Sequence, residues 1–424
     1  MGGTTYPSMV EEKKYPIVKS LPKFVVSHPT GNTFVRALLK QLVNQNQLEK
    51  FFTTIGFGDG TNPFVEYSCG GKRQYAIPDK IISRQWMPEF ARLFLKGDQA
   101  KKRHKTDQTY LALDRKVSCE LGNLNSLVLH AYEDGCHDSF SRAKELGIQC
   151  SYELPIVHWA TARRLLCEEA DRFPEWEPTL ESTREPEAKL FRKDEELRLA
   201  DRITCPSQFV LDSIPLEIRQ KTPCQISHFG SPLCEPIHFE RHIKSDNFRI
   251  LFVGSMSQRK GLADLFKAMK SLKNEPVSLS ILGQPSMPME FYQKQFSEFE
   301  YFPPCSNKKV REIMKMHDAL VLPSIVEGRA LVQQEALSCG LSILVTPNAG
   351  GEDLLDEGIT GHLVPIRSPE KIAEAITTMV VNRPNKEEIQ NLCQKKAKEY
   401  SWETYAQKVI DFNLPNTEQR LEIT

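Results

Sequence analysis

The sequence contains no apolar stretch close to the roughly 20 residues that a membrane-spanning helix needs. Residues 1–6 lack the apolar core of a signal peptide, and Tyr6 stands where a myristoylation signal has Ser or Thr. We therefore predict a cytoplasmic protein, and peripheral contact with the inner face of a membrane stays open.

A net charge is also absent, because Lys and Arg together number 55 and Asp and Glu together number 55. A protein that holds nucleic acid through bulk electrostatics is usually basic, so we expect no nucleic-acid partner. The 11 Cys residues form no C-x-x-C pair, which argues against a zinc site or a dithiol redox motif. Neither a bound cofactor nor a metal is predicted.

The C-terminal half alternates apolar runs with segments of helical periodicity. Strands are expected at residues 249–255, 277–281, 319–324, 342–346 and 361–366. Strand and helix alternate about six times through short connections, which predicts a parallel, doubly wound α/β sheet. Ligands bind such sheets beyond the carboxyl ends of the strands, so we expect the chemistry in the loops that follow them.

The N-terminal half begins in the same way. A strand is expected at residues 23–28, and apolar side chains recur at helical spacing over residues 34–42. Residues 124–130 are strand-like, and residues 101–105 (KKRHK) predict a solvated loop or helix end. The charged residues 185–202 predict an exposed amphipathic helix.

The strongest chemical element follows the strand at residues 319–324. A loop carries Glu327 and Gly328, and a helix is expected to open near Ala330 and to contain Glu335. A helix start offers free N–H groups to a phosphate, and small residues let the backbone approach it. The flanking carboxylates suit sugar hydroxyls better than phosphates. A βα unit with one capping and one solvent-facing Glu is the structural alternative.

The second element, GSMSQRKGL, follows the strand at residues 249–255 and opens a helix. It places two adjacent cations, Arg259 and Lys260, at a strand end. There they would face a diphosphate and neutralise the charge that builds on a nucleoside-diphosphate leaving group. A basic loop at the start of a surface helix is the alternative.

Three stretches of this half, RILFVGSMSQRKG, ALVLPSIVEGRALVQQEALSCG and NAGGEDLLDEGITGHLVP, resemble the donor domain of the family 4 retaining glycosyltransferases (glycosyl transferases group 1). The middle stretch carries the E-x7-E motif of that family. SHPTGNTFVRALL, AYEDG and YELPIVHWATARRLLCEEADRFPEW give a softer resemblance in the first half. The resemblance implies the GT-B fold, with two Rossmann-like, doubly wound parallel-sheet domains facing across a cleft.

The expected domains follow from this resemblance and from the sequence pattern. Residues 1–235 would form the N-terminal, acceptor-side domain, and residues 245–397 the C-terminal domain that binds the nucleotide sugar. Residues 398–424 would form a helical segment that crosses back to the first domain, with Trp402 in a packing role.

Carried onto this sequence, the resemblance implies that Lys260 and Arg259 bind the diphosphate, that Glu327 contacts the donor sugar and that Glu335 contacts the ribose. The other implied donor-site residues are Gly31, Gly254, Ser255, Pro304, Gly328, Arg329, Ala330 and Leu331. Two departures stand out. Ser255 replaces an Arg that many relatives have, and Arg329 and Ala330 replace the Phe and Gly of a frequent EGFG motif.

Acceptor-side candidates come from the turns of the first half. They are Asn32, Glu133, Asp134, Tyr152, Glu153 and His158. Glu133 and Asp134 could instead cap a helix, and the apolar surroundings of His28 and His158 favour structural histidines.

The resemblance implies transfer of a hexose from a UDP or GDP sugar, with retention and without a metal, to the hydroxyl of a glycan, lipid-linked or small-molecule acceptor. Polysaccharide, glycolipid or other glycoconjugate synthesis would be the setting. A nucleotide-sugar epimerase or a phosphorylase on the same fold, and a non-catalytic GT-B subunit, are the alternatives.

Overall fold

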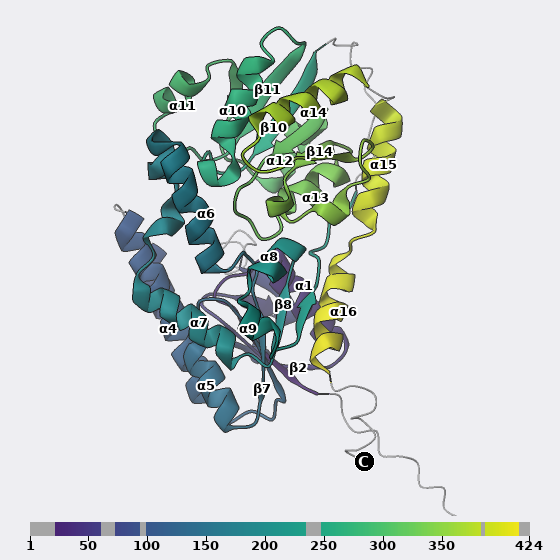
Figure 1. The fold of residues 1–424 in the computed structure, drawn as a ribbon. Coiled ribbons are helices and arrows are strands. Elements are labelled where there is room, and N and C mark those ends of the chain that lie inside the picture. Colours follow the sequence, from purple (N-terminus) through teal and green to yellow (C-terminus); the bar gives the residue numbers. More distant parts are fainter. Residues whose placement is uncertain (1–21, 61–72, 94–98, 235–246, 383–385, 415–424) are drawn as a thin grey trace, which may run out of the picture.

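The computed structural model describes residues 22–60, 73–93, 99–234, 247–382 and 386–414. It contains two large parallel β-sheets in two stacked domains, with helices packed around each sheet (Figure 1). The α/β class and the two doubly wound sheets expected from the sequence are confirmed. The domain limits at residues 1, 235 and 424 lie outside the described residues.

The N-terminal sheet has seven strands in the order β5-β2-β1-β6-β7-β8-β9, and every pairing is parallel. Its strands are β1 (Phe24–Ser27), β2 (Leu48–Thr53), β5 (Ile82–Arg84), β6 (Val128–Tyr132), β7 (Gln149–Glu153), β8 (Arg202–Cys205) and β9 (Cys224–Ile226). A short parallel pair, β3 (Phe57–Asp59) and β4 (Gln74–Pro78), lies beside it. Its helices are α1 (Thr33–Asn44), α3 (Trp86–Leu93), α4 (Gln99–Leu121), α5 (His137–Glu145), α6 (Trp159–Arg172), α7 (Glu187–Leu199), α8 (Gln208–Ser213) and α9 (Leu216–Arg219).

The C-terminal sheet has six parallel strands in the order β12-β11-β10-β13-β14-β15. They are β10 (Phe248–Val253), β11 (Val277–Leu282), β12 (Phe299–Phe302), β13 (Ala319–Leu322), β14 (Ser342–Val345) and β15 (Gly361–Leu363). The helices are α10 (Leu262–Ser271), α11 (Met289–Gln295), α12 (Asn307–Lys315), α13 (Leu331–Ser338), α14 (Pro369–Val381), α15 (Lys386–Lys398) and α16 (Trp402–Asn413). The chain order reverses between β10 and β13, so the loops that follow these two strands flank the switch point where such sheets bind ligands.

The sequence pattern located most strands of the second sheet because they are continuous apolar runs buried on both faces. It missed β12, whose residues are only partly buried and sit at the sheet edge. The expected strand at residues 124–130 is shifted to Val128–Tyr132. Residues 101–105 begin α4, which matches the helix-end alternative.

One segment of the N-terminal half packs with the C-terminal domain. Phe173 and Trp176, which follow α6, belong to the hydrophobic core around β10 and α10. The indole of Trp176 lies 4.9 Å from the ring of Phe291 and 6.0 Å from that of Phe266. This segment therefore forms part of the C-terminal core although it precedes β8 and β9 of the N-terminal sheet.

The last helix, α16, packs against α1 in the N-terminal domain (Figure 1). The hydroxyl of Tyr405 donates a hydrogen bond to Glu153 at the end of β7. At the start of α16, Trp402 stacks on Phe229 with the ring centroids 6.0 Å apart. The C-terminal end of the described chain thus ties the two domains together.

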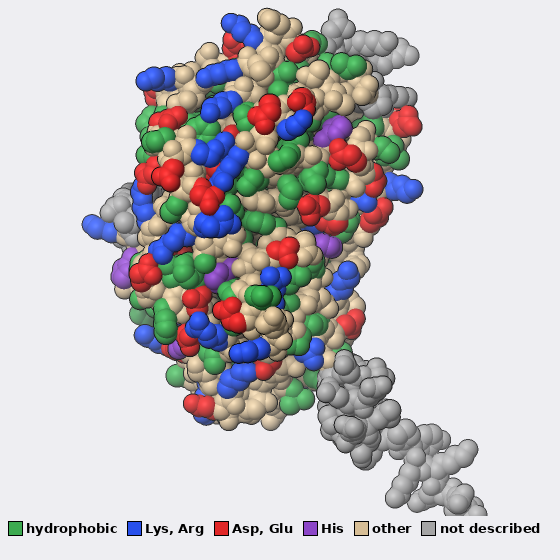
Figure 2. All heavy atoms as spheres, in the orientation of Figure 1, with side chains coloured by type: hydrophobic (Ala, Val, Ile, Leu, Met, Phe, Trp, Pro, Cys, Tyr) green, Lys and Arg blue, Asp and Glu red, His purple; other side chains and the backbone are tan. Residues whose placement is uncertain are grey.

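Acidic and basic side chains are interspersed over the face shown in Figure 2, as the zero net charge leads one to expect. Among the residues that the structure describes, no helix has the length and apolar character needed to cross a bilayer. Within the same residues, no group of three or more His, Cys, Asp or Glu side chains is arranged to hold a metal ion.

Candidate active site

The structure brings the adjacent residues Arg259 and Lys260 together with Glu327, which lies far from them in the sequence. Both the Lys260 ammonium and the Arg259 guanidinium form ion pairs with the Glu327 carboxylate, the latter at 2.6 Å. Lys260 and Glu327 are almost fully buried. Burial on its own raises the pKa of Glu327, but the two cations outweigh it and hold that pKa below its ordinary value.

The two cations sit in a tight turn between β10 and α10. A 3-10 turn spans Gln258–Lys260, and Gly261 follows with φ of +73°. A Cβ atom on Gly261 would also overlap the carbonyl oxygen of Pro323 after β13. Only glycine meets both demands, and the resulting close approach of the two loops positions Arg259 and Lys260 beside Glu327.

Gln258 anchors this turn and was not identified from the sequence. Its side-chain amide donates to Glu169 at 2.6 Å and to Asp264 at 2.9 Å, and its oxygen accepts the N–H of Ala263 at 2.8 Å. Gln258 and Glu169 are wholly buried. Buried polar groups that are fully hydrogen-bonded fix their surroundings, so Gln258 holds the backbone that carries the two cations.

Cations from other elements complete this network. Arg172 of α6 pairs with both Glu169 and Asp264, at 2.8 and 2.9 Å, and Arg367 pairs with Glu169 at 2.5 Å. No sequence motif marks these residues, because they lie on α6, on α10 and in the loop before α14. Their role follows only from the packing of α6 against the C-terminal domain.

The loop after Glu327 touches the N-terminal domain. A Cβ atom on Gly328 would overlap the carbonyl oxygen of Pro155, and the Ser207 hydroxyl donates to the Gly328 carbonyl at 2.6 Å. The Val157 N–H points to the Glu327 carbonyl at 3.4 Å. The candidate site therefore lies at the junction of the two domains.

Residues 235–400 match the sequence model of a family described as Glycosyl transferases group 1. This part of the chain is therefore similar to the group 1 glycosyltransferases. It is 28% identical over 177 residues to the D-inositol 3-phosphate glycosyltransferase of Paenarthrobacter aurescens (strain TC1), a match that covers 39% of this chain and 43% of the relative. An alpha-maltose-1-phosphate synthase of Mycobacterium tuberculosis (strain H37Rv) is 22% identical over 38% of this chain and 46% of the relative. The chain thus spans less than half the length of these two relatives.

The similarity to solved structures extends over both domains. A sucrose-phosphate synthase from Thermosynechococcus elongatus superimposes with a TM-score of 0.64 at 14% identity, covering 95% of this chain and 100% of that one. An alpha,alpha-trehalose-phosphate synthase (UDP-forming) from Burkholderia vietnamiensis gives 0.62 at 11% identity, over 95% and 100%. The protein therefore has the GT-B fold.

The predicted donor contacts of the C-terminal domain follow the carboxyl ends of its strands β10, β12 and β13. The side chain of Lys260 passes over Gly254, and the hydroxyl of Ser255 lies 3.3 Å from that of Ser257. Pro304 is exposed in the loop after β12. Ala330 and Leu331 begin α13, where Ala330 occupies the N-cap position without a side-chain cap.

Glu335 lies in the middle of α13 and is partly buried. Its carboxylate has no hydrogen bond or ion pair within the described part of the chain, and burial raises its pKa, which Arg311 lowers in part. An unsatisfied carboxylate of this kind can accept hydrogen bonds from a ligand. The ribose contact stays a prediction.

The environment of Arg329 differs from the one expected. We expected a donor contact, but its side chain is fully buried and its guanidinium is engaged by other residues of the C-terminal domain. It donates to both carboxylate oxygens of Asp353 at 2.6 and 3.0 Å and to the Gly350 carbonyl at 2.9 Å, and it lies over the ring of Tyr400. These contacts use most of its five N–H groups, so Arg329 braces the loop after Gly328.

Tyr152 and Glu153 were expected to contact the acceptor. Both are completely buried, so that expectation is not met. They point to opposite faces of β7, as neighbouring strand residues do. Tyr152 packs in the core near Phe140, and Glu153 accepts from Tyr405 at 2.6 Å and lies 3.3 Å from His130. Glu153 therefore ties α16 to the N-terminal sheet.

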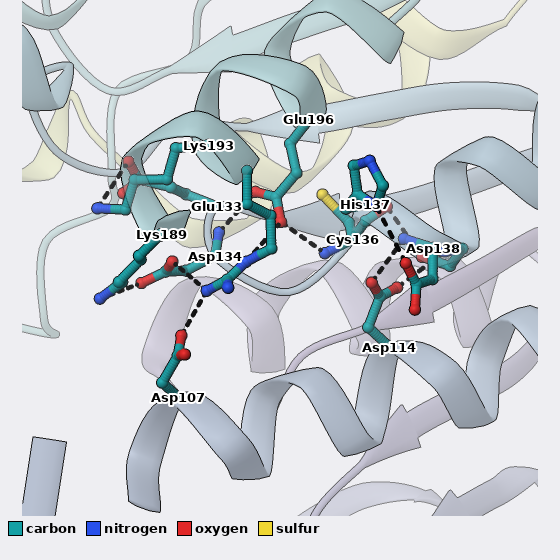
Figure 3. Close-up of polar contacts among 12 residues, drawn as sticks. Asp107, Asp114, Glu133, Asp134, Cys136, His137, Asp138, Lys189, Lys193 and Glu196 are labelled. Atoms are coloured by element: carbon teal, nitrogen blue, oxygen red, sulfur yellow. Dashed lines mark hydrogen bonds and ion pairs between the residues drawn. The ribbon is translucent and has the colours of Figure 1, made fainter. Parts of the chain in front are cut away.

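Glu133 and Asp134 lie at the carboxyl end of β6 but face α7 (Figure 3). Asp134 has a left-handed backbone, with φ of +80°, and pairs with Lys189 at 2.8 Å. Glu133 lies 3.4 Å from Lys193. The charged side chains of α7 that were expected to be exposed are thus partly buried, because they compensate these carboxylates.

The remaining N-terminal candidates have different environments. Gly31 and the exposed Asn32 lie after β1, two strands from β7 and so roughly 10 Å from the Pro155 loop. His158 accepts from the Ala160 N–H at the start of α6 and lies 3.1 Å from Asp194, which is a capping role. Burial lowers the pKa of His28 to about 3, so that ring is neutral.

Proposed function

We propose that this protein is a glycosyltransferase that moves a sugar from a nucleoside-diphosphate sugar to an acceptor hydroxyl, with retention of configuration. The observation that carries the proposal is the buried cluster of Arg259, Lys260 and Glu327 at the switch point of the C-terminal sheet. The match of residues 235–400 to the group 1 family supports the class of reaction.

The ligand-free cluster keeps a net positive charge, because one carboxylate faces two cations. An incoming diphosphate carries more negative charge than Glu327 and would compete for Arg259 and Lys260. Glu327 would then be released to accept hydrogen bonds from the hydroxyls of the sugar. Donor binding in this proposal exchanges an internal ion pair for one between protein and ligand.

In the proposed reaction, the bond between the anomeric carbon and the diphosphate oxygen breaks and the acceptor oxygen bonds to the same face of that carbon. The acceptor proton passes to the departing phosphate. Arg259, Lys260 and the start of α13 stabilise the leaving group. The contact of Gly328 with Pro155 places this chemistry where the N-terminal domain can present an acceptor and exclude water.

The proposal has a direct test. Purified protein is screened by thermal shift and by hydrolysis against UDP, GDP, ADP and dTDP sugars, with and without divalent metal. A ligand that binds the native state raises the melting temperature, and the shift should be reduced in Lys260→Met and Glu335→Gln but not in Lys273→Met, a matched control at an exposed site of the same domain.

Three outcomes would contradict the proposal. Isomerisation of the donor to another sugar nucleotide, without an acceptor, would indicate an epimerase. Absorbance from a pyridoxal group would indicate a phosphorylase. Binding without turnover across a panel of glycan, lipid-linked and small-molecule acceptors would indicate a non-catalytic subunit.

The proposal includes peripheral contact of the protein with the inner face of a membrane.

A further inference from the structure

The helix α3 buries a charged side chain and exposes apolar ones, which is the opposite of a typical surface helix of a globular protein. Its acidic residue, Glu89, is only 2% exposed and pairs with Arg73 at 2.6 Å and with Arg92 at 2.7 Å. An amphipathic helix normally turns its apolar stripe inward and its charges toward solvent. Here the inward face carries a buried carboxylate.

The outward face of α3 is apolar. Trp86, Met87 and Phe90 are 56%, 68% and 51% exposed. Trp86 and Phe90 are one helical turn apart, and Met87 is one turn from Phe90, so the three share a face. In the part of the chain that the structure describes, no other helix exposes more than one large hydrophobic side chain to this degree.

The helix that packs against α3 begins with a basic segment. The first turns of α4 expose Lys101, Lys102, Arg103 and His104. Lys101 and Lys102 have no acidic partner among the described residues. α4 runs along the outer flank of the N-terminal domain, beside α7 (Figure 1).

The position of α3 on α4 follows from the packing. The two helices pack together, and the charges of Arg92 and Glu89 both affect the pKa of Tyr110 of α4, which burial raises. Lys101 lies about 14 Å along α4 from Tyr110, at 1.5 Å per residue. The exposed apolar residues and the exposed basic residues therefore belong to two helices that pack against each other.

We propose that α3 and the start of α4 form a docking surface for an anionic lipid bilayer. Aromatic and methionine side chains would enter the boundary between headgroups and acyl chains, while the basic residues contact the headgroups. Each basic residue near an anionic surface strengthens binding about fivefold. The charge complementarity favours a lipid surface over an apolar protein groove. The surface is separate from the cluster around Lys260 and does not depend on the proposed transferase activity.

The test is co-sedimentation of the full chain with vesicles of phosphatidylcholine alone and of phosphatidylcholine with phosphatidylglycerol. We expect at least tenfold stronger binding to the anionic vesicles, falling as salt rises. Trp86→Ser with Phe90→Ser should abolish binding. Lys101→Glu with Lys102→Glu should weaken it at least tenfold. Phe191→Ser, at an exposed aromatic of α7, and Lys270→Glu with Lys273→Glu are the matched controls and should bind like the original protein.

Equal binding to both vesicle types, or unchanged binding by the α3 variant, would overturn the proposal. Light scattering of the eluted protein adds a second arm. A dimer that dissociates in the α3 variant, with no vesicle binding in either, would assign the surface to self-association instead. Circular dichroism and melting curves verify that the variants fold, and nucleotide-sugar binding should be unchanged in all of them.

Discussion

The Lys260 ammonium and the Glu327 carboxylate form an ion pair that joins the loops after β10 and β13. Arg259 donates to the same carboxylate and also to the Val326 carbonyl at 2.9 Å. The site is therefore pre-assembled before a ligand arrives, with two cations held on one carboxylate. This arrangement makes distinct predictions for the cationic and the anionic partner.

Removing the cation should damage turnover. In Lys260→Met we expect kcat to fall by about a hundredfold or more, because one group that stabilises the leaving diphosphate is lost. Stability should fall by less than the roughly 3–5 kcal/mol of a fully broken buried ion pair, since Arg259 still compensates Glu327. Steady-state kinetics and urea unfolding measure both effects. Turnover unchanged from that of Lys273→Met would remove Lys260 from the mechanism.

Removing the anion should have the opposite effect on nucleotide binding. In Glu327→Gln, Arg259 and Lys260 no longer have a competing carboxylate, so we expect a free nucleoside diphosphate to bind about tenfold more tightly. Sugar transfer should fall, because the neutral amide is a poorer acceptor for sugar hydroxyls. Calorimetry of the diphosphate tests this, with Glu312→Gln, on the surface of α12, as the control. Weaker binding in Glu327→Gln would contradict the exchange of ion pairs.

A methyl group at Gly328 should separate the domains. Its Cβ would overlap the Pro155 carbonyl, so Gly328→Ala must displace one loop from the other. We expect a loss of roughly 1–3 kcal/mol of stability and a larger radius of gyration in solution scattering. At Gly135 a Cβ would meet its nearest neighbour at 3.7 Å, so Gly135→Ala is the control. An unchanged radius in Gly328→Ala would show that the contact is dispensable.

Replacing Gln258 should disturb the positions of Arg259 and Lys260, although Gln258 itself is not expected to contact the ligand. Gln258→Leu removes hydrogen bonds to two buried carboxylates, each worth about 1.5–3 kcal/mol when the acceptor is charged. We expect lower stability and a fall in kcat, because the turn carrying Arg259 and Lys260 loosens. Gln258→Glu should not rescue either property, since it adds a third carboxylate, whereas Gln293→Leu on the surface of α11 should be neutral. Normal kcat in Gln258→Leu would refute the positioning role.

Glu196 makes the stability depend on pH. Burial raises its pKa to about 8, although the N–H groups of Cys136 and Asp134 that bond to it act in the other direction. The unfolded pKa is about 4.3, so the folded state holds the proton more tightly and stability falls as pH rises from about 4.3 through 8. Glu196→Gln should be less stable than the original protein at pH 6, by about 1 kcal/mol for one weakened hydrogen bond, and more stable at pH 9. If the melting temperatures of Glu196→Gln and of the original protein differed by the same amount at every pH in this range, the raised pKa of Glu196 would be contradicted.

The sequence predicted the strands and helices that have a clear local pattern of apolar residues. Continuous apolar runs marked β10, β13 and β14, because strands of a parallel sheet are buried on both faces. The same pattern located Lys260 and Glu327, since each follows such a strand. The sequence pattern missed β12, whose residues are only partly buried at the sheet edge, and α15, whose residues are mostly polar.

The sequence by itself determined the α/β class, the doubly wound sheets and the residues at the strand ends, because these depend on near-neighbour periodicity and on the common edge of parallel strands. Only the tertiary structure decided what each charged side chain meets. Arg329 pairs with Asp353 rather than being free for a ligand. Glu153 accepts a hydrogen bond from Tyr405, and Gln258 donates one to Glu169. A buried charge or polar group must find a partner, and that partner can come from any part of the chain that the fold brings near, so its identity is not written in local sequence.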